Sequence, residues 1–301
     1  MKRSKSWREL DTESRHPRSG RLDRMTAEEI VTLVVEEDRR GLEAVLRANS
    51  ALAHAAEWLA ETLEAGGSAL LAGAGTSGRL GVLEAAECPP TFGTDPSRLR
   101  AEMAGGEDAL FRAREGAEDR ESDGRDAVRG IGRGDLVIAI SASAVTPFAH
   151  GALAAGRELG ARTVLLTCAP PGGRGELADL VIALDTGPEV LTGSTRLKAG
   201  SATKAALNAI TTAAMVRLGK VYENLMVELR PGSAKLRDRA LRIVEIAARV
   251  PREEAERLLA RAGGEVKTAI VMALEQIEPD PARRRLAEAG GHLWRALGEA
   301  E

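Results

Sequence analysis

Short apolar runs alternate with segments of helical periodicity through the middle of the chain. The runs predict strands, and the connections between them are long enough for the crossover helices that join parallel strands. The predicted strands are residues 68–72, 99–104, 136–140, 162–167 and 180–184. This alternation indicates an α/β fold with a doubly wound five-stranded parallel sheet, which binds ligands beyond the carboxyl ends of its strands.

Two helices are predicted before the sheet. Thr26 followed three residues later by Glu29 is typical of a capping box, so the first helix should continue beyond Glu37. An alanine-rich segment predicts the second helix from about residue 40 to residue 64, where two glycines end it. The later helices of the sheet domain are expected at residues 118–128, 148–159 and 197–218.

The chain is expected to have three parts. Residues 1–24 are polar and basic, which predicts a flexible arm, and residues 25–232 are expected to form the sheet domain with its leading helices. Strand signals stop after Pro231 and Gly232, and residues 233–301 predict a small helical bundle. Its expected helices are residues 234–248, 251–262, 266–276 and 283–297, with Leu258, Leu259, Ile270 and Leu274 in the core.

The composition restricts the classes of function. The 301 residues carry a net charge of −3 and only 2% aromatic residues, which argues against nucleic-acid binding. No apolar run is long enough to span a membrane, and the basic N-terminus lacks the apolar core of a signal peptide. Cys88 and Cys168 are far apart and the four histidines lack metal-binding spacing, so we expect a cytoplasmic protein without a metal.

A glycine-rich loop, GAGTSG at residues 73–78, follows the first predicted strand and precedes a helix that Pro89 and Pro90 are expected to end. The glycine spacing of this loop matches the dinucleotide-binding fingerprint, which also requires an acidic residue about 20 positions further on. Glu102 is near that position, but the Met-Ala-Gly-Gly segment that follows it makes a poor adenosine pocket. Free amide groups and the positive end of a helix dipole favour an anion there. The residues predicted to contact this anion are Gly75, Thr76 and Ser77.

A second loop, SASAVTP at residues 141–147, follows another strand and opens another helix. Two strand ends with hydroxyl side chains at helix N-termini suit one phosphomonoester, held by neutral hydrogen-bond donors. The alternative is that these hydroxyls only cap helices. The predicted phosphate contacts in this loop are Ser141, Ser143 and Thr146.

A third loop, GPEVLTGSTRLKAG at residues 187–200, also runs from a strand end into a helix. It is dense in small, hydroxyl and basic residues, and Glu189, Ser194 and Lys198 are its candidate substrate-binding residues. The alternative is that Glu189 and Lys198 form a solvated charge pair.

Together these motifs resemble those of the N-acetylmuramic acid 6-phosphate etherases, a family of the sugar isomerase (SIS) superfamily. The match rests on residues 73–93, on EGAED at residues 115–119 and on residues 187–200. Residues 12–30 and 255–274 are similar to the family's N-terminus and to its C-terminal ubiquitin-associated-like bundle. The resemblance implies a cytoplasmic homodimer near whose interface the active site lies, with no metal or redox cofactor.

The resemblance also implies a reaction and two catalytic carboxylates. The family cleaves the D-lactyl ether of a cell-wall sugar 6-phosphate by elimination and then water addition. Glu87 of AAECPP matches the family's acid, with Glu84 as its nearest competitor, and Glu118 of GAED matches the base. From the residues alone, Glu118 is more typical of a solvated helix start.

One departure from the family pattern concerns the second loop, where Ala144 and Val145 replace a Gly-Arg pair. The replacement removes easy access to positive φ and a fixed charge, which bears on phosphate affinity and sugar specificity. Two other functions remain open: a sugar-phosphate-sensing regulator of the glucokinase-regulator type, and a sugar-phosphate isomerase.

Overall fold

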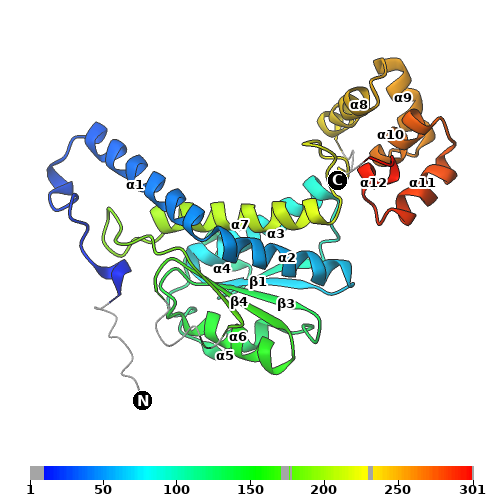
Figure 1. Ribbon diagram of the computed structural model, residues 1–301. Helices are drawn as coiled ribbons and strands as arrows, with labels where there is room; N and C mark the ends of the chain where they lie inside the picture. The colour runs from blue at the N-terminus through cyan, green and yellow to red at the C-terminus, as the bar shows by residue number, and fades with distance from the viewer. Residues whose placement is uncertain (1–9, 171–175, 177, 230–232, 300–301) are drawn as a thin grey trace. The chain divides into compact units, whose positions relative to one another are not determined.

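The computed structural model describes residues 10–170, 176, 178–229 and 233–299. They form two compact units (Figure 1). The first is the chain up to Ala85 with Ser97–Thr211, and the second is Ala86–Pro96 with Thr212–Glu301. Residues 1–9 of the expected arm, and the expected boundary at Pro231 and Gly232, lie outside the described residues.

The first unit contains the predicted parallel sheet, which is confirmed. Its strand order is β2-β1-β3-β4-β5, and every pairing is parallel. Every residue of β1 and β3 is buried, which explains why these strands are continuous apolar runs rather than alternating patterns. The strands are β1 Ala69–Gly73, β2 Leu99–Met103, β3 Leu136–Ile140, β4 Arg162–Thr167 and β5 Leu180–Ala183.

The chain reverses its winding direction between β1 and β3. β1 pairs with β2 on one side and with β3 on the other, and Gly73 is the register partner of Ile140 at the carboxyl ends. The loops that follow these two strands therefore open at the same edge of the sheet. This is the place where doubly wound sheets bind their ligands.

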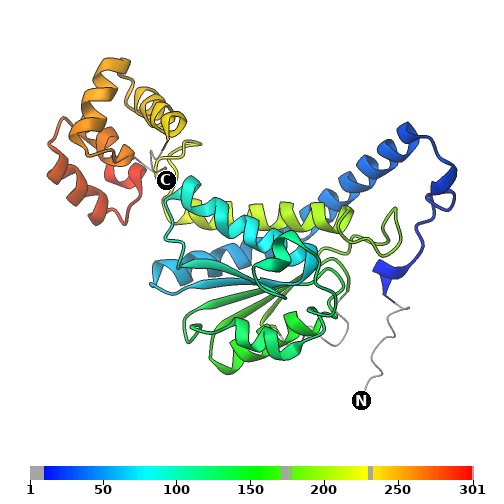
Figure 2. The same ribbon diagram turned by 180° about the vertical axis from the view of Figure 1, so that it is seen from behind.

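Helices cover both faces of the sheet. In both views α2 (Asn49–Glu64) and α7 (Lys198–Arg217) lie on one side, and α5 (Glu121–Ala127) and α6 (Pro147–Glu158) on the other (Figures 1 and 2). Glycines allow α5 and α6 to pack at very short range. A Cβ atom on Gly151 of α6 would lie 2.1 Å from a backbone oxygen of α5.

The predicted capping box is present at the start of α1 (Ala27–Arg47), where the Glu29 amide donates to the Thr26 hydroxyl and the Thr26 amide to the Glu29 carboxylate. The boundary expected near residue 40 is wrong, because α1 continues to Arg47 and α2 begins at Asn49. The weak helix former in this interval is Gly41, and it is required by packing. A Cβ atom there would lie 3.0 Å from Cγ of Lys198.

Two expectations for α3 (Gly75–Phe92) are corrected. The glycine-rich segment is a shorter turn than predicted, because the helix already begins at Gly75. The helix also continues through Pro89 and Pro90 to Phe92. A proline lacks its own N–H donor but keeps its carbonyl, and the Pro89 carbonyl accepts from the Gly93 amide at 3.0 Å.

The helix predicted at residues 118–128 is shorter, because α5 begins at Glu121 and Glu118 lies before it. No sequence pattern indicated α4 (Asp108–Phe111). Residues 10–24 include two short 3-10 helices, Asp11–Glu13 and Leu22–Arg24, and Leu10, Thr12 and His16 are buried.

The second unit is helical, and its core joins residues 222–229 to the bundle. Leu258, Leu259 and Ile270 are buried as predicted, whereas Leu274 is 42% exposed and does not belong to the core. The helix expected at residues 283–297 is two helices, since Gly290 and Gly291 both adopt positive φ between them. The helices are α8 Ala234–Ala248, α9 Arg252–Arg261, α10 Val266–Glu275, α11 Pro279–Glu288 and α12 Leu293–Ala296.

Within the described part of the chain, no helix combines the length and the apolar character that crossing a membrane requires.

Candidate active site

A cleft of about 230 Å³ lies at the reversal point of the sheet, within the first unit. It brings together residues from both predicted hydroxyl loops and the predicted base Glu118. Among the described residues that line it, none is basic and three are acidic. The cleft is lined by Leu10, Thr12, Glu13, Ala74, Gly75, Thr76, Ser77, Glu118, Asp119, Ala142, Ser143, Thr146, Pro147, Gly193 and Thr195.

The first loop places the N-terminus of α3 at the cleft. Gly75, Thr76 and Ser77 form the first turn of this helix and all line the cleft. The turn is held against β1 by Gly78, where a Cβ atom would lie only 2.6 Å from the Gly73 backbone oxygen. Amide groups of a first helical turn and adjacent hydroxyls offer donors to an anion without a positively charged side chain.

The second loop is held by its own hydroxyl groups. The Ser141 and Thr146 hydroxyls lie 2.8 Å apart, and Ser141 is buried while Ser143 and Thr146 line the cleft. Thr146 is the N-cap residue of α6, but its side chain makes no capping hydrogen bond. The capping alternative therefore does not describe this residue, which lines the cleft instead.

Ala144 adopts φ 60°, so the loop reaches the left-handed region without the glycine of the family pattern. Its methyl group is buried, in a small cluster with Ala149 and Leu153 of α6. The packing of this methyl group offsets the strain that a non-glycine residue carries in this conformation.

Glu118 is exposed and lies at the rim shared by two cavities. Besides the cleft, it lines a neighbouring cavity of about 170 Å³, and Ala74 and Gly75 also line both. Its backbone carbonyl accepts a 3.0 Å hydrogen bond from the Phe148 amide in the first turn of α6. The base predicted from the family match is therefore positioned by the helix that follows the second loop.

Glu189 and Lys198 of the third loop are buried, so the solvated-pair alternative is wrong. The Glu189 carboxylate accepts from the backbone amides of Lys198 at 3.1 Å and Ala199 at 2.8 Å, which satisfies the start of α7. Burial raises the pKa of Glu189, and the two amide donors only partly oppose this. Ser194 does not line the cleft, although its neighbours Gly193 and Thr195 do.

The Lys198 ammonium group is also engaged within the protein. It donates to the Pro188 carbonyl and to the carboxylate of Glu37 in α1, both at 2.8 Å, and Nε2 of His16 lies 3.2 Å from the same carboxylate. Burial alone would raise the pKa of Glu37, but Lys198 and His16 outweigh it and the pKa is lowered. This buried cluster joins the N-terminal segment to α1 and α7.

The N-terminal segment contributes cleft residues that sequence reasoning missed. Leu10, Thr12 and Glu13 line the cleft, and the Gly193 amide donates to the Thr12 carbonyl at 3.1 Å. A signal was available, since residues 12–30 resemble the family's N-terminus, but no spacing rule connects residue 12 to residue 193. Asp119 and Thr195 were missed beside predicted residues.

The predicted acid Glu87 does not line the cleft. It is exposed in α3, twelve residues after Gly75, which is about 18 Å along a helix axis. Its competitor Glu84 is buried and accepts hydrogen bonds from Lys204 and Thr211 of α7, which leaves it a structural carboxylate.

The two cysteines, both described, form no disulfide. Cys168 is buried, and burial raises its pKa to about 11, which keeps it a neutral thiol near pH 7. Among the described residues, no group of three or more His, Cys, Asp or Glu side chains is arranged to hold a metal ion.

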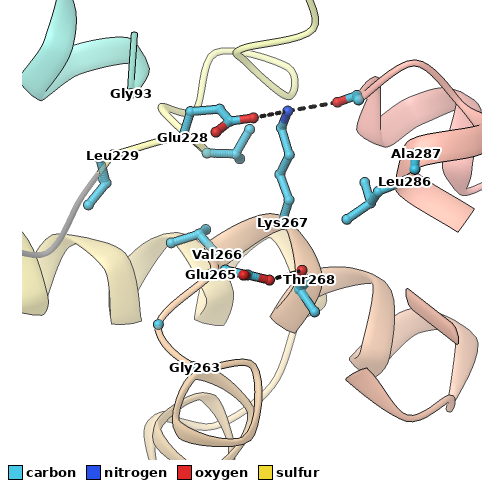
Figure 3. Close-up of a pocket in the computed structure, with 13 residues that line it drawn as sticks. Gly93, Glu228, Leu229, Gly263, Glu265, Val266, Lys267, Thr268, Leu286 and Ala287 are labelled. Carbon is cyan, nitrogen blue, oxygen red and sulfur yellow. Dashed lines mark hydrogen bonds and ion pairs between the residues drawn. The ribbon is translucent and has the colours of Figure 1, made fainter. Parts of the chain in front are cut away.

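A larger cavity, of about 560 Å³, lies within the second unit and contains none of the predicted site residues. Lys267 of α10 crosses it, with its ammonium group between the Glu228 carboxylate and the Gly291 carbonyl (Figure 3). Burial lowers the pKa of Lys267, against the opposing effect of Glu228. The Lys267 ammonium group therefore stabilises the second unit through these two contacts.

Comparisons with known proteins extend over nearly the whole chain. A family model for the glucokinase regulatory protein N-terminal SIS domain matches residues 51–157. The structure of a phosphoheptose isomerase from Neisseria gonorrhoeae aligns with 62% of this chain and 95% of that chain, at 19% identity and a TM-score of 0.45.

Proteins named N-acetylmuramic acid 6-phosphate etherase are much more similar. One from Rubrobacter xylanophilus is 50% identical over 293 residues, which cover 97% of this chain and 97% of that protein. Another from Synechococcus sp. strain CC9902 is 48% identical over 276 residues, which cover 91% of this chain and 87% of that protein. The chain therefore belongs to the N-acetylmuramic acid 6-phosphate etherase family.

Proposed function

We propose that the protein is a carbon–oxygen lyase that converts N-acetylmuramic acid 6-phosphate and water into N-acetylglucosamine 6-phosphate and D-lactate. The observation that carries this is the 50% identity, over 97% of both chains, to a protein named for that activity. The cleft supports it with donors suited to a phosphate and a carboxylate suited to proton abstraction.

The phosphate is expected to bind at the two hydroxyl loops. Gly75, Thr76, Ser77, Ser143 and Thr146 line the cleft. Ser141 is buried, and its hydroxyl group forms a hydrogen bond with the Thr146 hydroxyl that positions Thr146. Because none of the described cleft residues is basic, we expect hydroxyls, backbone amides and the positive ends of helix dipoles to meet the phosphate charge.

Three residues of the third loop are proposed to act by positioning that loop: Glu189, Ser194 and Lys198. Glu189 and Lys198 satisfy the start of α7 and hold the loop that carries Gly193 and Thr195 to the cleft.

Glu118 is proposed as the base. In the ring-opened sugar the C1 aldehyde acidifies the C2 proton and accepts the electron pair that its removal leaves. Glu118 takes this proton, the C3–O bond breaks, and the lactate oxygen leaves with a proton from an acid. Water then adds to C3 of the unsaturated aldehyde, and a proton returns to C2.

Glu87 is proposed as the acid that protonates the leaving lactate. This role rests on the family match of residues 73–93, because Glu87 does not line the cleft of its own chain. Its exposed carboxyl group is accessible to a ligand. We also infer, from the same family match, that the protein acts as a homodimer in the cytoplasm.

The test is release of D-lactate from N-acetylmuramic acid 6-phosphate by the purified protein. In water labelled with ¹⁸O, the label is expected at C3 of the sugar product and not in the lactate, because the bond to C3 breaks. Glu118→Gln should lower the rate by about 10²- to 10⁴-fold. Binding of a hexose 6-phosphate without turnover would instead indicate a sensing regulator, and aldose–ketose interconversion an isomerase.

A further inference from the structure

The cavity of about 170 Å³ that shares Glu118 with the cleft is lined by two arginines, whereas no described residue of the cleft is basic. It is formed where the segment after β2 folds over α3, and both Arg79 and Arg114 line it. Its remaining walls are mainly small or apolar, including Met103, Ala109 and Ala113. The cavity thus combines two arginines and two glutamates, Glu115 and Glu118, with small and apolar residues.

Arg79 is held in place by backbone carbonyls rather than by a carboxylate. Its Nε donates to the Leu110 carbonyl at 2.9 Å and its Nη2 to the Ala109 carbonyl at 2.6 Å. No described residue forms an ion pair with its guanidinium group. Glu115 and Glu118 also line the cavity, but neither pairs with this guanidinium group.

Arg114 is placed by a tight turn. Gly105, at φ +85°, packs so closely that a Cβ atom there would lie 3.3 Å from Cδ of Arg114 and 3.1 Å from the Ala109 side chain. The charge partner of Arg114 is Asp108, which is 78% exposed and lies at 2.5 Å. A solvent-exposed pair of this kind is weak and leaves Arg114 able to bind another anion.

We infer that this cavity is the subsite for the carboxylate of the lactyl group, with Arg79 and Arg114 as specificity-determining residues. The inference rests on the proposed function, whose substrate carries two anions: a phosphate at C6 and a carboxylate on the ether at C3. Glu118 must lie beside C2, and it stands between the cleft and the cavity. A phosphate in the cleft therefore directs the C3 substituent past Glu118 towards the arginines.

The donor groups of the two sites support a phosphate in the cleft and the lactyl carboxylate beside the arginines. Planar guanidinium groups match the two oxygens of a carboxylate, whereas the cleft offers neutral donors on several sides, as a phosphate requires.

The test compares two sugars that differ only in the lactyl group. Arg114→Gln is expected to raise KM for N-acetylmuramic acid 6-phosphate about tenfold or more, the effect of one charge-assisted hydrogen bond. The inhibition constant of N-acetylglucosamine 6-phosphate should stay within about twofold, since that sugar has the phosphate and no carboxylate. Arg112→Gln is the matched control, because Arg112 is an exposed arginine of the same loop that lines neither cavity.

Arg79→Lys is a second variant, because it keeps the charge and one donor to the α4 carbonyls but loses the guanidinium fork. It should show the same selective loss. An equal loss for both sugars would place the phosphate in the arginine cavity, and no loss for either would show that the cavity binds no anion. Either result overturns the inference while lactate release by the unmodified protein still stands; absence of that release overturns the proposed function instead.

Discussion

Nζ of Lys198 lies 2.8 Å from Oε2 of Glu37, and this ion pair between α7 and α1 is almost fully buried, with side chains 3% and 2% exposed. Lys198→Met would leave the Glu37 carboxylate in the interior without its main partner, so we expect a loss of about 3–5 kcal/mol in the free energy of unfolding. Urea titration followed by circular dichroism measures it. The control is Arg39→Met, which removes an exposed pair with Glu43 and should cost about 0–1 kcal/mol. Equal costs for the two variants would contradict a structural role for Lys198.

Stability should fall in acid partly through Glu37. Its folded pKa is lowered below the ordinary value of 4.5, so its contribution is present above about pH 4.5 and is lost as the pH falls through the folded pKa. In Glu37→Gln this contribution is absent, and the free energy of unfolding should depend less steeply on pH below 4.5. Parallel pH curves for the two proteins would show that Glu37 is not the group responsible.

Gly78→Ala should damage the proposed phosphate site and the fold together. The new Cβ atom would lie 2.6 Å from the Gly73 oxygen and 2.7 Å from Cγ of Met103, so the first turn of α3 must move away from β1. We expect a loss of about 2 kcal/mol or more, measured by thermal unfolding, and weaker binding of N-acetylglucosamine 6-phosphate. Gly132→Ala is the control, since nothing lies within 4 Å of its added Cβ and its φ is not positive. Its stability should change by about 0.5 kcal/mol or less.

Ala144→Gly should be nearly neutral. Relief of about 1–2 kcal/mol of left-handed strain is offset by the lost methyl burial and by the greater freedom of glycine in the unfolded chain. Ala144→Val should cost about 3 kcal/mol or more, because a branched side chain at φ 60° is both strained and crowded. Phosphate affinity of Ala144→Gly should match the parent protein, since the loop already has this backbone conformation. A large gain in affinity would show that the alanine distorts the loop.

Glu84 and Glu87 are three residues apart in α3 and should respond oppositely to neutral substitution. Glu84→Gln removes a buried charge that accepts from Lys204 and Thr211, so we expect a stability loss of about 1–3 kcal/mol with little change in kcat. Glu87→Gln alters an exposed residue, so the melting temperature should hold while lactate release is lost. Full lactate release by Glu87→Gln would exclude it as the acid.

Much of the fold was predictable because its rules are local. Strands buried on both faces must be continuous apolar runs, and this placed all five strands to within one residue at most of their ends. The helix that continues through Pro89 and Pro90, and the helix pair separated by Gly290 and Gly291, were harder, because neighbouring turns decide whether a breaker is tolerated.

The sequence alone determined that two hydroxyl-bearing loops each follow a parallel strand and precede a helix. It also contained the EGAED motif, which is recognisable without a structure. Folding was needed to establish that β1 and β3 are neighbours, so that these loops meet, and that Thr12 and Glu13 reach the same cleft. The tertiary structure also shows that Lys198 forms a buried ion pair with Glu37. It further shows that Arg79 and Arg114 line a cavity that Glu118 also lines. These relationships join residues distant in the chain, and burial and charge compensation select such partners only when the chain is folded.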